Sequence, residues 1–277
     1  MQKKVIENVR KFLKNIGGLE KLKNHSFLNE WNGTCDCDSL SGVKQIYALL
    51  WGNPNDYKHY LPDFNLKEIG ICTGKYGGET INSFNTFFGN PRKNFDEQYK
   101  DHCILDNLGI AQCFIEPTDN GLIKMISDFE QKVYSIGNFM LMPKLHPLKK
   151  ASMNQHRGLR IIGWKDLFDK FLFELMKCLN TPKSQETDKY LLELVYINKF
   201  YFEKISTIEK FCEVNYLDVY DYICDGKPIF ERGLSPFNVN EPQEYIHFII
   251  KYINTCTTII EKRADKMIKS LENLYDF

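Results

Sequence analysis

The sequence predicts an α+β fold that is predominantly α-helical, with a small β-sheet in the first half covered by helices and long helices in the second half. Two observations predict this class. Short apolar runs that resemble strands are confined to the first 142 residues, where they alternate with helical patterns. From residue 163 onward, apolar residues recur every three or four positions, which is typical of helices that bury one face. This order of elements favours helices packed over a small sheet.

Length and charge restrict the class of protein. A chain of 277 residues can bury a substantial core without disulfides or metal. It has no internal repeat or long flexible linker, so we expect one compact domain over residues 1–277. The alternative is a division near residue 160 between a mixed α/β half and an all-α half. Lysine plus arginine and aspartate plus glutamate both number 36, which argues against a surface that is basic throughout but permits a local basic patch.

Three further features bear on compartment and cofactors. No apolar run approaches the roughly 20 residues that cross a bilayer, and the N-terminus lacks the apolar core of a signal peptide. The nine cysteines are scattered, as free thiols are in a reducing compartment. Cys35 and Cys37 form a close pair, but no second pair or histidine cluster follows at metal-site spacing. We therefore expect a cytoplasmic protein with no membrane contact, no metal and no cofactor.

The first half alternates between helical and strand-like segments. Residues 2–16 form an amphipathic helical pattern that ends at Gly17-Gly18. Its basic face is typical of a solvated surface on a docked helix, although basic amphipathic helices also lie on membranes or nucleic acid. Residues 40–51 predict a second helix, with Ser39 as its N-cap. The other expected elements are a strand at 69–74, a turn at 75–78, helices at 79–89, 95–108 and 122–132, and strands at 111–116 and 133–142.

The second half is helical with one long loop. Apolar side chains at helical spacing predict three main helices, at 163–179, 186–212 and 243–274. The middle one is apolar almost all round, which predicts a buried central helix broken near Ser206. A short helix at 214–224 and a proline-rich loop at 226–242 separate it from the last helix. The outer face of the last helix is expected to hold Glu261, Lys262, Arg263, Asp265 and Lys266.

Residues 134–158 are the strongest candidate for a functional site. They join a strand-like run to a compact set of polar residues. Gly137 interrupts the strand-like run, and glycine at such a position indicates a bulge or the close approach of a ligand or of other backbone. The side chains expected to bind a ligand are Tyr134, Asn138, Asn154, Gln155 and Arg157.

Functional and structural roles are both consistent with these side chains. An arginine fork beside asparagine and glutamine amides is typical of sites for a phosphate, a carboxylate or a base edge. Alternatively, Arg157 pairs with a buried carboxylate and Asn154 caps a turn. A weaker candidate is the group Asp101-His102-Cys103, which contains a base and a thiol. The sequence contains no serine nucleophile elbow, Walker motif, dinucleotide fingerprint or metalloprotease motif.

Two segments of this stretch resemble a large bacterial family of uncharacterised proteins. They read Tyr134-Ser-Ile-Gly-Asn-Phe-Met-Leu-Met-Pro143 and Met153-Asn-Gln-His-Arg-Gly158. The family pattern is similar to Thr-Ile-Gly-(Gly/Asn)-Phe-(apolar)-Pro, then Asn-(Gln/Gly)-x-Arg-Gly and a long helix. Tyr47-Ala-Leu-Leu-Trp51 also resembles a Tyr-x-x-Leu-Trp segment of that family. The resemblance implies no activity, and it supports treating residues 134–158 as one unit.

Two hypotheses for function follow. The first is a cytoplasmic bacterial protein, of the toxin or phage-defence kind, that binds or acts on a nucleotide or nucleic acid through residues 134–158. Arg157 would hold a phosphate and Tyr134 would stack on a base, while the sequence leaves open whether the protein is an enzyme. The alternative is a non-catalytic protein-interaction module built on the helical second half, where the loop that begins at Pro228 is rich in aromatic residues.

Overall fold

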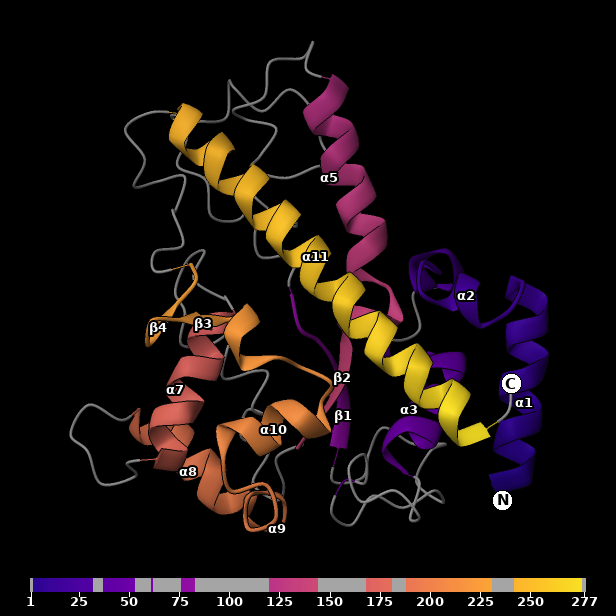
Figure 1. Cartoon of the computed structure of the whole chain (residues 1–277), viewed down its shortest axis with the longest axis horizontal. Helices are drawn as coiled ribbons and strands as arrows, with labels where there is room; N and C mark the ends of the chain where they lie inside the picture. Colours follow the sequence, from indigo (N-terminus) through magenta and orange to yellow (C-terminus); the bar gives the residue numbers. More distant parts are fainter. Residues whose placement is uncertain are drawn as a thin grey trace.

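One long helix runs diagonally across the molecule, and elements from both halves of the chain pack against it. The computed structural model describes residues 2–31, 37–52, 61, 76–82, 120–143, 168–180, 188–230 and 242–275. The long helix is α11 (Pro242–Tyr275), with 34 residues, and it matches the helix predicted at 243–274. Helix α5 (Asn120–Val133) lies along its first part, and the N-terminal helices lie beside its last part (Figure 1).

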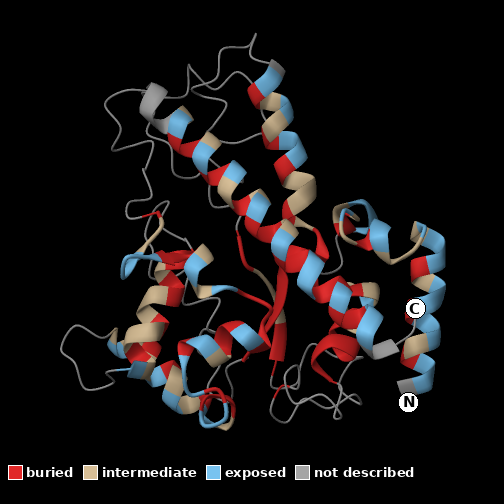
Figure 2. Cartoon of the chain, in the orientation of Figure 1, coloured by how far each residue is buried: buried red, intermediate tan, exposed pale blue. Residues whose placement is uncertain are grey.

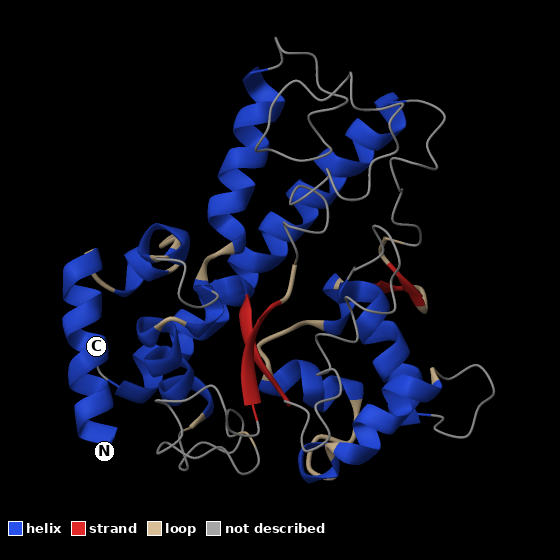
Figure 3. Ribbon diagram, turned by 180° about the vertical axis from the view of Figure 1, so that it is seen from behind, coloured by secondary structure: helices blue, strands red, loops and turns tan. Residues whose placement is uncertain are grey.

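The fold is α+β and predominantly helical, as predicted. Strands β1 (Tyr76–Thr80) and β2 (Phe139–Pro143) form a two-stranded antiparallel sheet in which Tyr76 pairs with Pro143 and Thr80 with Phe139. Every residue of β2 is buried, and the sheet stands at the centre of the molecule with helices on either side of it (Figure 3). A hairpin of β3 (Ile223–Cys224) and β4 (Lys227–Pro228) lies apart from this sheet. In the described ranges, no helix combines the length and apolar character needed to span a membrane.

The N-terminal helices follow the predicted pattern, with one correction. Helix α1 (Gln2–Ile16) ends where Gly17 and Gly18 take positive φ angles of 95° and 103°. The Gly18 amide donates to the Leu13 carbonyl at 2.7 Å, which closes the helix as predicted. Helix α3 (Ser41–Trp51) was expected to be capped by Ser39, and this is wrong. Ser39 ends a 3₁₀ turn, η2 (Cys37–Ser39), and its hydroxyl donates to Asp38 instead. The connection between α1 and η2 contains α2 (Leu19–Leu22) and a further 3₁₀ turn, η1 (Phe27–Glu30).

The expected turn at 75–78 and the start of a helix at 79 are wrong, because β1 occupies Tyr76–Thr80. Glycines favour turns locally, but here they allow close packing. A Cβ on Gly78 would lie 2.4 Å from the Asp38 carbonyl oxygen, so only glycine lets the strand pass so close to η2. The pairing with β2 then outweighs the poor strand propensity of Gly77 and Gly78. The segments 69–74, 95–108 and 111–116, for which strands and a helix were expected, lie outside the described residues.

The predicted strand at 133–142 begins later than expected. Helix α5 extends through Val133, and a 3₁₀ turn, η7 (Ile136–Asn138), precedes β2. Backbone from α11 packs directly against this turn, which replaces the first half of the expected strand. Helix α5 itself confirms the helix predicted at 122–132.

The second half is broken into shorter helices than the sequence pattern predicted. Helix α7 (Phe168–Asn180) confirms a helix within the predicted range 163–179 and extends one residue beyond it. The expected central helix at 186–212 is three helices, α8 (Lys189–Ile197), α9 (Lys199–Phe202) and α10 (Ile208–Val214). The break near Ser206 is confirmed, and a second lies at Asn198, whose side-chain amide donates to the Leu194 carbonyl at 2.9 Å. The expected helix at 214–224 is a 3₁₀ turn, η8 (Val219–Asp221), followed by β3.

Buried residues lie along the inner faces of the helices, throughout strand β2 and at the start of β1 (Figure 2). They form two clusters. The larger joins the sheet to α1, α3 and α7–α10, and the smaller joins α5 to the first part of α11. The indole of Trp51 in α3 donates to the Val214 carbonyl at 2.8 Å, which ties the N-terminal helices to the end of α10.

Substitution of Gly137 by alanine tests the closest contact in this core. A Cβ there would lie 2.2 Å from the Ile260 carbonyl oxygen and 2.9 Å from the Ala264 Cβ, so α11 must shift. We expect Gly137→Ala to lower the free energy of unfolding by about 1–3 kcal/mol, measured by chemical denaturation. Gly42→Ala is the matched control, because its Cβ would meet Phe12 at an ordinary 3.7 Å. Equal effects from the two substitutions would contradict the close approach.

Candidate functional site

Asn138, one of the predicted ligand-binding residues, is fully buried and bonded within the protein. Its amide oxygen accepts from the backbone and side-chain nitrogens of Asn82 at 2.9 and 3.0 Å. Its amide nitrogen donates to the carbonyls of Asn82 and Val133, both at 2.9 Å. These four bonds use the hydrogen-bonding capacity of the amide. They favour the structural role, in which Asn138 joins the end of β1 to the end of α5.

The rest of the predicted site is only partly described. Tyr134 is half-buried at the end of α5, packs against the core, and accepts through its carbonyl from the Phe27 amide at 2.9 Å. Asn154, Gln155 and Arg157 lie outside the described residues, as does the group at 101–103. Their roles therefore stay predictions. The prediction of a close backbone approach at Gly137 is confirmed, since the carbonyl of Ile260 in α11 faces it.

Arg263 is a central residue that the sequence pattern placed wrongly. It was expected on the outer face of the last helix, yet only 2% of it is exposed. Its Nε donates to the Asn215 carbonyl and its Nη1 to the Gly137 carbonyl, both at 2.8 Å. Burial lowers the pKa of the guanidinium to about 10, and the nearby phenol of Tyr222 opposes this shift. Arg263 therefore joins α11 to η7 and to the end of α10.

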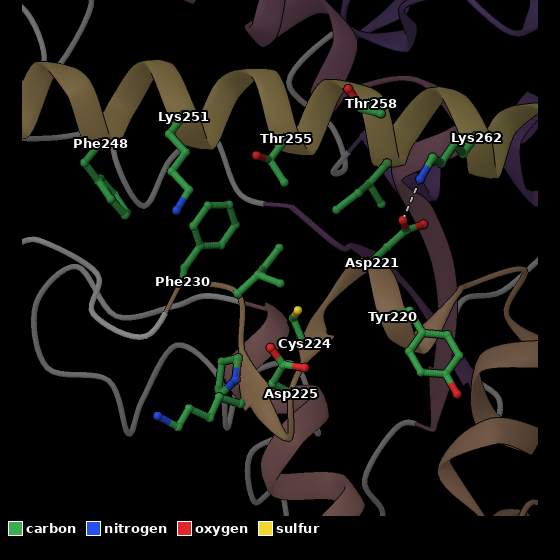
Figure 4. A pocket seen from close by; sticks show the side chains of 14 residues that line it. Tyr220, Asp221, Cys224, Asp225, Phe230, Phe248, Lys251, Thr255, Thr258 and Lys262 are labelled. Atoms are coloured by element: carbon green, nitrogen blue, oxygen red, sulfur yellow. Dashed lines mark hydrogen bonds and ion pairs between the residues drawn. The ribbon is translucent and has the colours of Figure 1, made fainter.

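A groove lies between α11 and the segment that contains η8 and the β3–β4 hairpin. Its volume is about 1040 Å³. Its floor is apolar and consists mainly of Ile229, Phe230, Phe248 and Ile259. Lys251 points from α11 into the groove, on the same side as Phe248 and Thr255, while Cys224 and Asp225 face it from the hairpin (Figure 4). The groove is larger than a second concave surface along α11, described below, and is our candidate functional site.

Local sequence explains how the hairpin wall forms. Asp225 and Gly226 connect β3 to β4, and both take positive φ angles, of 50° and 72°. An Asp-Gly pair with positive φ at both positions is the preferred two-residue turn of a hairpin. The loop predicted at 226–242 therefore begins with the second turn residue, Gly226, followed by strand β4, and its residues 231–241 lie outside the described residues. This tight turn places Asp225 at the exposed tip of the wall.

The other side of the hairpin is attached to α7 by a buried carboxylate. Asp169, which is 1% exposed, accepts from the Phe230 amide at 2.7 Å and from the Lys170 amide at 2.8 Å. Burial raises the pKa of this carboxyl to about 6, although both amides favour the ionised form. The bond to Phe230 fixes the position of the groove wall relative to the protein core.

Charged side chains of both signs line the groove, and they are distributed unevenly along its length. At one end, Lys262 of α11 forms an ion pair with Asp221 at 2.7 Å (Figure 4). At the other end, the exposed Lys251 has no ion-pair partner among the described residues. The described part of the chain has no group of three histidine, cysteine or acidic side chains placed to hold a metal ion. The groove therefore offers Lys251 as an available cation, the carboxylate of Asp225 and the ammonium of Lys227 at the hairpin side, and an apolar floor.

A second, smaller groove continues along the same helix beyond Lys262. It has a volume of about 570 Å³ and lies between α10 and the last part of α11. Its charged lining residues are Glu209, Glu213, Asp218, Lys266 and Lys269. Acidic side chains outnumber basic ones here, so the second groove differs in electrostatic character from the first.

Comparisons with protein-family models, with curated proteins and with solved structures found no match. The resemblance of residues 134–158 to an uncharacterised bacterial family therefore stays a prediction from the motifs.

The pH dependence of stability tests the buried carboxylate. Because the pKa of Asp169 is raised on folding, its stabilising contribution is complete below about pH 4 and is lost as pH rises through about 6. The difference from the ordinary value of 3.8 corresponds to about 3 kcal/mol. We expect the unfolding free energy of the native protein to fall by up to that amount, relative to Asp169→Asn, between about pH 4 and 7. Denaturant titrations at several pH values measure this difference; an increase with pH would contradict the assignment.

Proposed function

We propose that the protein binds a small phosphorylated ligand of the nucleotide class in the groove between α11 and the β3–β4 hairpin. The observation that carries this proposal is Lys251, an exposed cation without an ion-pair partner among the described residues, which points into a groove with an apolar floor. A lysine ammonium beside open space is a ready site for phosphate oxygens.

The floor of the groove is rigid enough to orient a flat apolar group. The ring centroids of Phe230 and Tyr252 are 5.3 Å apart, and Phe248 stacks near Tyr252 at 6.3 Å with an interplanar angle of 24°. Aromatic contacts of this kind add to the free energy of burial and fix the rings in place. The Phe230 backbone is also held by Asp169. A base or another planar ring would therefore meet a preformed surface, as in most small-molecule sites.

Polar groups at the hairpin side complement the hydroxyl groups of a sugar. Asp225 is exposed at the tip of the hairpin, and the carboxylate of Asp221 lies at the far end of the groove with Lys262. Carboxylates accept hydrogen bonds and cannot donate them when ionised, so they match hydroxyl donors and repel phosphate. The phosphate is therefore placed at the Lys251 end. The Lys251 end, the apolar floor, and the hairpin side with Asp225 and Lys227 correspond to the three parts of a nucleotide.

The charges along α11 favour a small ligand here over a nucleic-acid strand. A strand laid along the helix would leave the first groove and enter the second, whose lining contains three acidic residues and two lysines, Glu209, Glu213, Asp218, Lys266 and Lys269. Like charges brought against phosphates are repulsive at short distance. A single nucleotide avoids this contact because it stays within the first groove.

Substitution of Lys251 tests the proposal directly. We expect ATP or AMP to raise the melting temperature of the native protein, and Lys251→Gln to weaken binding roughly 10- to 100-fold, which corresponds to loss of one charge-assisted contact. Isothermal titration calorimetry gives the affinities. Lys269→Gln is the control, since Lys269 is also exposed on α11 but lines the second groove. Equal losses in the two variants, or no binding by the native protein, would refute the proposal.

A further inference from the structure

Helix α1 presents a strongly basic surface at the opposite end of the molecule from the hairpin (Figure 1). It contains five cations, Lys3, Lys4, Arg10, Lys11 and Lys14, and one acid, Glu7. At about 100° per residue, the five cations fall within an arc of about 120° on the helix surface, and Glu7 lies within the same arc. All six charged residues are exposed. The chain as a whole has no net charge, so this excess of positive charge is local.

The lysines of this face are available to a partner. Lys3, Lys4, Lys11 and Lys14 form no ion pair with the described residues. Lys23, which follows α2, differs, because it pairs with Asp265 of α11 at 2.6 Å. The cations on this helix face outnumber the single carboxylate of Glu7, so they repel one another, and an approaching polyanion relieves that repulsion.

The apolar face of α1, opposite the cations, distinguishes a membrane surface from nucleic acid as the anionic partner. A helix that binds a membrane surface inserts its apolar face among the lipids. In this structure that face is already used, because Val9 and Leu13 are buried and the Phe12 ring lies against α3 beside Gly42. Only the charged face of the docked helix is open to solvent. It can make contacts with phosphates but cannot insert into a bilayer.

The dimensions of α1 fit a phosphate backbone. A helix of 15 residues is about 22 Å long, and one strand of duplex DNA places about six phosphates along that distance. Cations at both ends and in the middle of α1 can therefore meet several phosphates at once. We propose that the exposed face of α1 binds the phosphate backbone of nucleic acid without sequence preference. This surface is separate from the groove, so the proposal does not depend on nucleotide binding at Lys251.

The test uses the full chain and a fluorescently labelled duplex DNA of about 20 base pairs, titrated by anisotropy from ~50 to ~200 mM salt. We expect binding that weakens with salt. Substituting Lys3, Lys4, Lys11 and Lys14 together by glutamine should weaken binding at least tenfold and reduce the slope of log affinity against log salt by about 3. Replacement of the same four residues by arginine should preserve binding.

A matched control and a second probe make the result decisive. The control variant replaces four other exposed lysines, Lys189, Lys204, Lys266 and Lys269, by glutamine, and should bind DNA as the native protein does. Circular dichroism establishes that each variant is folded. Absence of DNA binding at low salt, or an equal loss in the control, would overturn the proposal. So would binding to phosphatidylserine vesicles in place of DNA. Lys251→Gln should leave DNA binding unchanged, which separates this surface from the groove.

Discussion

The contact between α11 and η7 is the constraint on which the other packing depends. Gly137 lets the α11 backbone approach until the Ile260 carbonyl lies where a side chain would otherwise begin. Arg263, one turn further along α11, then reaches the Gly137 carbonyl and, on its other side, the Asn215 carbonyl. Gly137 in η7, which has no side chain, and Arg263 in α11, which has a long one, therefore both fix the position at which α11 crosses η7. The register of α11 against the central sheet follows from that crossing.

A buried arginine is costly, and its surroundings explain why it is tolerated. Transfer of the guanidinium from water is unfavourable, which is why its pKa falls. The hydrogen bonds to two carbonyl oxygens offset part of the free-energy cost of burying the guanidinium, since hydrogen bonds from a charged donor are strong. The two carbonyls also come from segments more than 70 residues apart in the sequence, so one side chain joins η7, α10 and α11. The Asn138–Asn82 amide bonds extend this polar centre to the end of β1.

The sequence predicted α1, α3, α5 and α11 well because their signal is local, whereas the breaks among α8–α10, the polar centre and the groove depend on contacts between distant segments. The ranges of α1, α3, α5 and α11 followed from apolar spacing alone. Arg263 could have been placed correctly, since it lies three residues after Ile260 and four before Met267, on the buried stripe. Strand β1 could not have been predicted from the sequence, because Gly77 and Gly78 are typical of a turn. Their role becomes clear only from the structure, in which the Asp38 backbone lies beside Gly78. The groove was not predicted either, because its two walls come from segments that are separated in the sequence. One wall is η8 together with the β3–β4 hairpin, and the other is the middle of α11.

The fixed crossing at Gly137 also determines how the two proposed binding surfaces relate. The groove lies on the part of α11 from Phe248 to Lys262, and α1 lies beside its end, with Arg263 between them. Coupling between sites requires an element that both ligands bias between two arrangements. Movement of α11 against η7 in either direction would break the two Arg263 hydrogen bonds or press Ile260 into Gly137. The helix therefore acts as a rigid support, and the physical argument favours two surfaces that bind their partners independently.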